Sequence, residues 1–124
     1  MTLTMVSPLV HETPSPPCTL GVVAHTEGTR TVVVLRGEAD LATRWVLADV
    51  LSQLTGNADG DVVIDLAGLD FIDSGTLGSL VVAHELLERQ GRALTVRSPS
   101  RLATRVLGFL GVSELIESAD AGER

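Results

Sequence analysis

Residues 61–80 of the chain read DVVIDLAGLDFIDSGTLGSL. The apolar run at 62–64 has the length and the β-branched character of a buried strand. After it we expect an acidic loop, whose aspartates are Asp65, Asp70 and Asp73. Ser74 then precedes a segment with helical periodicity, and a small polar residue in that place is typical of a helix N-cap. This stretch therefore predicts a strand, an acidic loop and a hydroxyl group at the start of a helix.

The residues before this stretch predict a hairpin and a first helix. Residues 18–26 and 30–35 have strand patterns, and the short turn between them makes the pair antiparallel. A helix follows over 41–54, and either Asp40 or Thr43 can cap its start. Its apolar positions recur at helical spacing on one face, and they are Leu47, Val50, Leu51 and Leu54.

The residues after it predict a second helix over 75–90, a strand over 93–96 and a third helix. The Ser98-Pro99 pair is typical of a cap followed by a proline in the first turn, and Gly111 ends the third helix. A short strand or turn near 115–116 closes the domain. The expected apolar faces are Leu77, Leu80, Val81, His84 and Leu87 in the second helix, and Leu102, Val106, Phe109 and Leu110 in the third.

This order of elements predicts an α/β domain. Strands that are joined through helices require right-handed parallel crossovers, whereas the first hairpin is antiparallel, so the sheet is mixed. We expect the folded domain to span residues 18–117. The proline-rich residues 1–17 are expected to form a flexible N-terminal extension, and the polar residues 118–124 a C-terminal tail.

Composition excludes several classes of function. A chain of 124 residues with a net charge of −7 does not favour nucleic acid or an anionic membrane surface as a partner. The sequence contains no lysine, which excludes a mechanism that needs a lysine amine. Aromatic residues make up only 2% of the chain, so the core must be aliphatic.

The cysteine and histidine content predicts neither a disulfide nor a metal site. Cys18 is the single cysteine, and the three histidines are widely separated in the sequence. Residues 1–10 lack the features of a signal peptide, and no apolar run approaches the roughly 20 residues of a membrane span. We therefore expect a cytoplasmic protein without cofactors, as a monomer or weak dimer.

Several segments together resemble the STAS domain family. Residues 37–43, GEADLAT, are similar to its G-E-hydrophobic-D segment, and residues 62–66 and 69–74 to its strand and D-S phosphorylation loop. Leu77-Gly78 and residues 106–112 fit the same frame. The resemblance covers about residues 18–117. Within the family, the chain most resembles the free-standing anti-sigma factor antagonists.

This resemblance implies a mixed sheet of four or five strands with helices packed mainly on one face, and no catalysis. It implies a partner that is both an anti-sigma factor and a serine kinase, whose capture releases a sigma factor. Ser74 stands in the place of the phosphorylated serine and Asp73 in that of the loop aspartate, while Asp40 matches an acid near the binding surface. Phosphorylation would end the capture, and a serine phosphatase would restore it. The implied binding surface comprises Asp40, Asp70, Asp73, Ser74, Gly75 and Thr76.

The chain departs from the family in one respect. Family loops continue D-S-[Ser or Thr]-G, whereas Gly75 and Thr76 stand here in the opposite order. Thr76 therefore becomes a second candidate acceptor for the phosphate.

Other interpretations of these residues remain open at the level of sequence. Ser74 and Asp40 can each act as helix caps, and Asp70 and Asp73 can be solvated loop acids. A serine hydrolase is not favoured, because the chain lacks a G-x-S-x-G motif. A phosphorelay receiver domain is not favoured because the chain has no lysine. The main rival is a STAS module of another system, such as a stressosome-like scaffold or a lipid-transport accessory subunit without a phosphoswitch.

Overall fold

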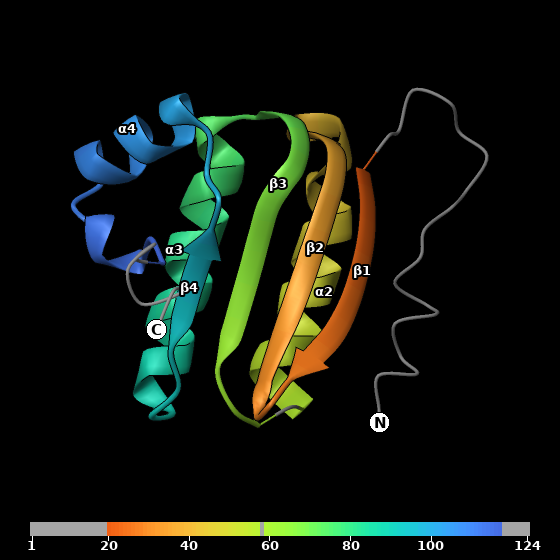
Figure 1. Cartoon of the computed structure of the whole chain (residues 1–124), viewed down its shortest axis with the longest axis vertical. Coiled ribbons are helices and arrows are strands. Elements are labelled where there is room, and N and C mark those ends of the chain that lie inside the picture. The colour runs from red at the N-terminus through yellow and green to blue at the C-terminus, as the bar shows by residue number, and fades with distance from the viewer. Residues whose placement is uncertain (1–19, 58, 118–124) are drawn as a thin grey trace.

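The computed structural model describes residues 20–57 and 59–117 (Figure 1). The N-terminal extension over 1–17, Cys18 and the tail over 118–124 lie outside the described residues. In chain order the elements are β1 (Leu20–Glu27), β2 (Arg30–Ala39), η2 (Leu41–Thr43), α2 (Arg44–Asn57), β3 (Val62–Ile72), α3 (Ser74–Arg89), β4 (Leu94–Arg97), α4 (Arg101–Phe109) and η3 (Ser113–Leu115).

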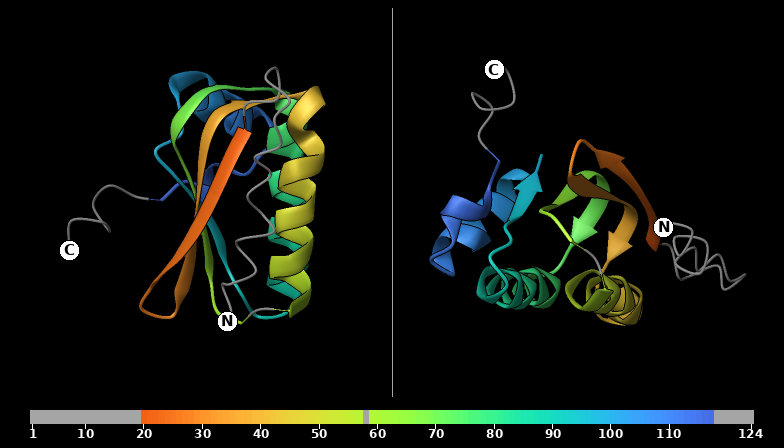
Figure 2. Two further views of the ribbon diagram at one scale, coloured as in Figure 1. Left: turned by 90° about the vertical axis from the view of Figure 1, so that its right-hand side faces the viewer. Right: turned by 90° about the horizontal axis from the view of Figure 1, so that it is seen from below.

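The four strands form one mixed sheet in the order β1-β2-β3-β4. β1 and β2 are antiparallel and meet at a tight turn in which Gly28 has a φ of 66°, while β2–β3 and β3–β4 are parallel. Helices α2 and α3 cover one face of the sheet, and α4 lies beside the β4 edge (Figure 2). The predicted α/β fold is thus confirmed, with four strands and one isolated bridge between Val96 and Ile116.

The core is aliphatic, as the composition predicts, and lies between the sheet and helices α2 and α3. The predicted face of α2 is buried throughout, and the leucines of the predicted α3 face are buried as well. The predicted face of α4 is wrong. Ala103 and Leu107 are its buried residues, whereas Leu102 and Phe109 are 59% and 83% exposed. A short helix beside a sheet edge buries only a narrow stripe, which its apolar pattern alone does not identify.

The prediction of an acidic loop after residue 64 is also wrong, because β3 continues to Ile72. The register with β2 shifts twice, between Val34 and Arg36 and between Gly37 and Glu38, so β3 contains extra residues at both places. Such bulges allow polar residues to remain within a strand. At the first shift, Asp65 Oδ1 accepts a hydrogen bond of 2.9 Å from the Ala67 amide.

Gly68 shows why this segment stays paired. A Cβ atom at Gly68 would stand 2.9 Å from the carbonyl oxygen of Leu35, closer than side chains normally approach a neighbouring strand. The glycine therefore allows β2 and β3 to remain close after the first bulge. As a result, Asp65 and Asp70 belong to the strand, and the connection to α3 is short.

The start of the third helix also differs from the prediction. Ser98 has a φ of 55° and lies outside the helix, and the cap is Ser100, whose Oγ accepts a hydrogen bond of 3.0 Å from the Ala103 amide. The predicted end is correct, since α4 ends at Phe109 and Gly111 adopts a φ of 76°. Near 115–116 the chain forms η3 and the isolated bridge rather than a strand.

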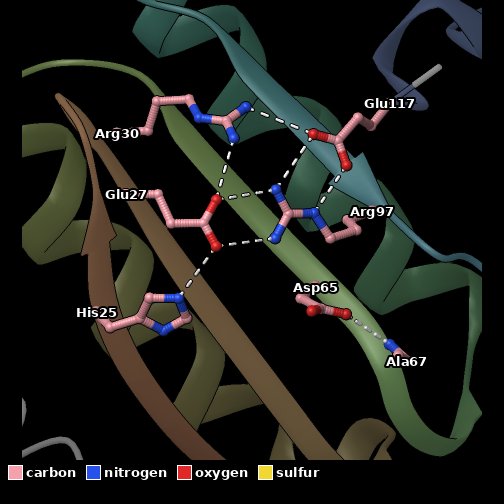
Figure 3. A network of polar contacts seen from close by, with 7 residues as sticks. All are labelled: His25, Glu27, Arg30, Asp65, Ala67, Arg97 and Glu117. Atoms are coloured by element: carbon pink, nitrogen blue, oxygen red, sulfur yellow. Dashed lines mark hydrogen bonds and ion pairs between the residues drawn. The ribbon is translucent and has the colours of Figure 1, made fainter. Parts of the chain in front are cut away.

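The open face of the sheet carries a polar network that the sequence does not predict (Figure 3). Arg97 at the end of β4 donates to both oxygens of Glu27 at the end of β1, at 3.2 and 3.3 Å. Arg97 Nε also donates to Glu117 at 2.7 Å, and Arg30 bridges the same two carboxylates at 3.1 and 3.4 Å. His25 lies 3.3 Å from Glu27. Two edge strands are thereby connected across the sheet.

This network explains how two apolar residues are buried on the face without helices. Val32 and Val63 pair with each other in the register, alternate with core residues of β2 and β3, and have no exposed surface. The Glu27–Arg97 ion pair joins β1 to β4, so it crosses both of the strands that carry these valines. Hydrogen bonds from Arg97 and His25 lower the pKa of Glu27 to about 2.

We expect Glu27→Gln to lower the melting temperature at pH 7 and to weaken the acid dependence of stability. Because the pKa of Glu27 is about 2 in the folded protein against an ordinary 4.5, its contribution is complete above pH 4.5 and is lost as the pH falls toward 2. Thermal unfolding at pH 7 and pH 3 measures this. Glu85→Gln on the exposed side of α3 is the control, and an unchanged pH dependence in Glu27→Gln would contradict the expectation.

Candidate functional site

The sequence-predicted site residues meet where β2 and β3 end and where η2–α2 and α3 begin, at the upper end in Figure 1. Ala39 and Ile72 are the last paired residues of the two strands. The Asp73 amide then donates a hydrogen bond of 3.0 Å to the carbonyl of Ala39. Asp40 and Asp73 therefore emerge side by side from neighbouring strands, each just before a helical segment.

Asp73 is the N-cap of α3. Its Oδ1 accepts a hydrogen bond of 2.8 Å from the Thr76 amide, which satisfies one of the free donors of the first helical turn. The sequence left open whether Ser74 has this role, and the structure gives it to Asp73. Ser74 is the first residue of the helix, its side chain is exposed, and within the described residues its hydroxyl makes no hydrogen bond.

Thr76, the second candidate acceptor, is buried. Its side chain lies within the first turn of α3 and the residue is only 1% exposed. A kinase could reach its hydroxyl only if the start of the helix opened. Accessibility therefore favours Ser74 over Thr76 as the position that an enzyme could modify.

Arg44, at the start of α2, is a site residue that the sequence analysis missed. Its Nη2 donates a hydrogen bond of 3.0 Å to Asp73 Oδ2, so the two oxygens of Asp73 have different partners. The guanidinium also lies against the backbone of Gly75, where an added Cβ would stand 2.7 Å from Arg44 Cζ. Local sequence patterns do not identify Arg44, because its partners lie 29 and more residues away in the chain.

The surroundings of Asp73 keep it ionised. Burial by itself would raise its pKa, but hydrogen bonds from Thr76 and the positive charge of Arg44 outweigh burial. The pKa of Asp73 therefore lies below its usual value. The site thus carries a fixed carboxylate immediately before the exposed serine.

Asp40 acts as a cap as well. Its Oδ1 accepts a hydrogen bond of 3.2 Å from the Thr43 amide, and its own amide donates to Thr43 Oγ1 at 3.0 Å. This reciprocal capping box begins the 3-10 turn that leads into α2. Asp70 is exposed near the end of β3, at the second register shift, so it adds negative charge beside the site.

Three exposed apolar side chains flank these polar residues, and sequence periodicity did not identify them as a group. Leu41, Trp45 and Phe71 are 74%, 50% and 48% exposed, and they neighbour Asp40, Arg44 and Asp70 in the chain. Apolar residues that surround a polar centre are typical of a protein-binding surface. The site can therefore bind a protein as well as present a hydroxyl.

Within 20–57 and 59–117, no three His, Cys, Asp or Glu side chains are grouped as metal ligands. None of the helices in that part of the chain combines the length and the apolar character needed to cross a bilayer.

Comparison with known proteins gives a family and a fold. A family model described as "Mlab, STAS domain" matches residues 22–117, and no curated protein matches the chain. SpoIIAA, an anti-sigma factor antagonist, is similar in its unphosphorylated form, with 18% identity over 85% of this chain and 93% of that one and a TM-score of 0.66. Phosphorylated SpoIIAA, a Bacillus cell fate determinant, has 18% identity over 85% and 96%, with a TM-score of 0.65.

An anti-sigma factor antagonist from Mycobacterium paratuberculosis is similar as well. It has 23% identity over 85% of this chain and 92% of that one, with a TM-score of 0.68. At these identities the solved structures establish a shared fold. The chain covers nearly the full length of each.

We expect Asp73→Ala to destabilise the protein by about 1 kcal/mol, because it removes the α3 cap together with the partner of Arg44. Asp73→Asn should cost less, since asparagine caps helices well but loses the charge. Chemical denaturation of both variants measures the difference. Wild-type stability in Asp73→Ala would contradict the assignment of the cap.

Proposed function

Because the chain belongs to the STAS domain family, we propose that it is an anti-sigma factor antagonist. It binds an anti-sigma factor that is also a serine kinase, and this binding releases a sigma factor. Two solved structures of similar fold are described as anti-sigma factor antagonists, which supports the proposal. The observation that carries it is the exposed Ser74, whose hydroxyl makes no hydrogen bond within the described residues, while Asp73 caps the helix.

In this proposal Ser74 is the phosphorylation site and switches binding off. Ser74 Oγ forms a bond to the γ-phosphorus of ATP, the bond from that phosphorus to ADP breaks, and the hydroxyl proton passes to the kinase or to water. The product carries roughly −1.5 to −2 units of charge and three acceptor oxygens in place of a neutral hydroxyl. A serine phosphatase reverses the modification.

The magnitude of this change is sufficient for a switch. A surface that fits a neutral hydroxyl would have to enclose a phosphate beside the ionised Asp73 and the exposed Asp70. Each ~1.4 kcal/mol of lost binding free energy weakens affinity tenfold. A cost of several kcal/mol, plausible for a charge enclosed in an interface, removes two to three decades of affinity. No change of fold is required.

The proposed partner-binding surface is the upper end of the sheet in Figure 1. It comprises Asp40, Asp70, Asp73, Ser74, Gly75 and Thr76, to which the structure adds the exposed Leu41 and Phe71. Thr76 contributes through the helix start rather than through its buried hydroxyl. The protein has no catalytic role in this proposal, which also places it in the cytoplasm as a monomer or weak dimer.

A second candidate is a STAS module of another system, such as a scaffold or a lipid-transport accessory subunit. The matching family model is described as Mlab, and the matches to anti-sigma factor antagonists have only 18% and 23% identity. In this alternative Ser74 would be part of a constitutive interface. Affinity capture with the wild-type chain separates the two, because an anti-sigma kinase among the retained proteins supports the first and its absence supports the second.

We expect incubation with the candidate anti-sigma kinase and ATP to place one phosphate on Ser74, as mapped by mass spectrometry. Ser74→Ala should abolish the incorporation. Thr76→Val, which replaces a buried hydroxyl by a methyl group, is the matched control and should retain it. Phosphate on neither residue would leave only an antagonist or scaffold without a switch.

A further inference from the structure

Arg44 contacts the residues on both sides of Ser74. Its Nη2 donates to Asp73 Oδ2 at 3.0 Å, and its guanidinium lies against the backbone of Gly75. The Arg44 side chain as a whole is 35% exposed. Its Nε is buried and makes no hydrogen bond within the described residues, which leaves one donor unused.

This placement gives a reason for the exchanged order of Gly75 and Thr76. A side chain at position 75 would begin with a Cβ that overlaps Arg44 Nη2 and stands 2.7 and 3.1 Å from its Cζ and Nη1. Serine or threonine at 75 would therefore require the guanidinium, which is the end of a flexible side chain, to move. Glycine at 75 leaves room for Arg44 in its present position.

We propose that Arg44 is the intramolecular receptor of the phosphate on Ser74. This inference rests on the proposed function, because it assumes that Ser74 is modified. Arg44 contacts both neighbours of Ser74, so its guanidinium would have to leave Asp73 Oδ2 to bind a phosphate on Ser74. An arginine fork matches phosphate oxygens, and the dianion is a stronger attractant than one partly exposed carboxylate oxygen.

The other charges at this end of the sheet are largely negative, so the role of Arg44 matters. Glu38, Asp40, Asp70 and Asp73 all lie there and oppose a phosphate by like-charge repulsion. Asp73 keeps its cap to the Thr76 amide through Oδ1 when Oδ2 loses its partner. Phosphorylation would thus replace the Arg44–Asp73 ion pair by an Arg44–phosphate pair between the starts of α2 and α3, and leave the helix itself unchanged.

A 31P NMR titration of the full chain, with phosphoserine incorporated genetically at position 74, tests this. A nearby cation favours the dianion, so Arg44→Gln should raise the second pKa of the phosphate by about half a unit or more relative to the wild type. Arg44→Lys, which keeps the charge but not the fork, should fall between them. Arg89→Gln, at the opposite end of α3, loses the same charge and should titrate like the wild type.

Equal phosphate pKa values in the wild type and Arg44→Gln would overturn the inference and leave the proposed function standing. Conversely, an Arg44-dependent pKa together with unchanged partner affinity of the phosphorylated protein would overturn the proposed function only. The steric pairing has a test that needs no phosphate. Gly75→Ser should lower the melting temperature more in the wild type than in an Arg44→Ala background, and equal losses would overturn the pairing.

Discussion

The parallel pairing of β2 with β3 determines where both helices lie and where the candidate site forms. Parallel neighbours require helical crossovers, and these place α2 and α3 on one face of the sheet. The pairing extends to Ala39 and Ile72 and ends with the hydrogen bond from the Asp73 amide to the Ala39 carbonyl. Both helices therefore start from the same end of the sheet, where β2 and β3 end, and residues distant in sequence meet there.

The two carboxylate oxygens of Asp73 have separate roles at this end of the sheet. One carboxylate oxygen caps α3, worth about 1 kcal/mol, and the other receives Arg44 in a partly exposed ion pair worth at most about 1 kcal/mol. The cap stabilises the helix, whereas the weaker ion pair allows Arg44 to change its partner. Because the cap is not Ser74, modification of its hydroxyl costs the helix no hydrogen bond. Stability and the proposed switch therefore reside in adjacent residues.

Sequence patterns predicted the elements and their order because periodicity and turn residues are local signals, as in α2 and the Gly28 hairpin. These patterns gave wrong predictions where contacts with a neighbouring strand or helix determine the structure. The acids of β3 lie in a strand because bulges against β2 accommodate them, and the α4 face depends on how the helix meets the sheet edge. Arg44 could not be predicted, because its partners are 29 and more residues away and meet it only through the crossover.

In the proposed function, charge at Ser74 controls binding, and calorimetric titration against the anti-sigma kinase measures this effect. The unmodified protein and the protein with phosphoserine at position 74 would be compared at the same salt concentration. Phosphorylation should raise the dissociation constant by about 100-fold or more, on the scale of ~1.4 kcal/mol for each tenfold change. Equal dissociation constants for the two forms would rule out the proposed switch.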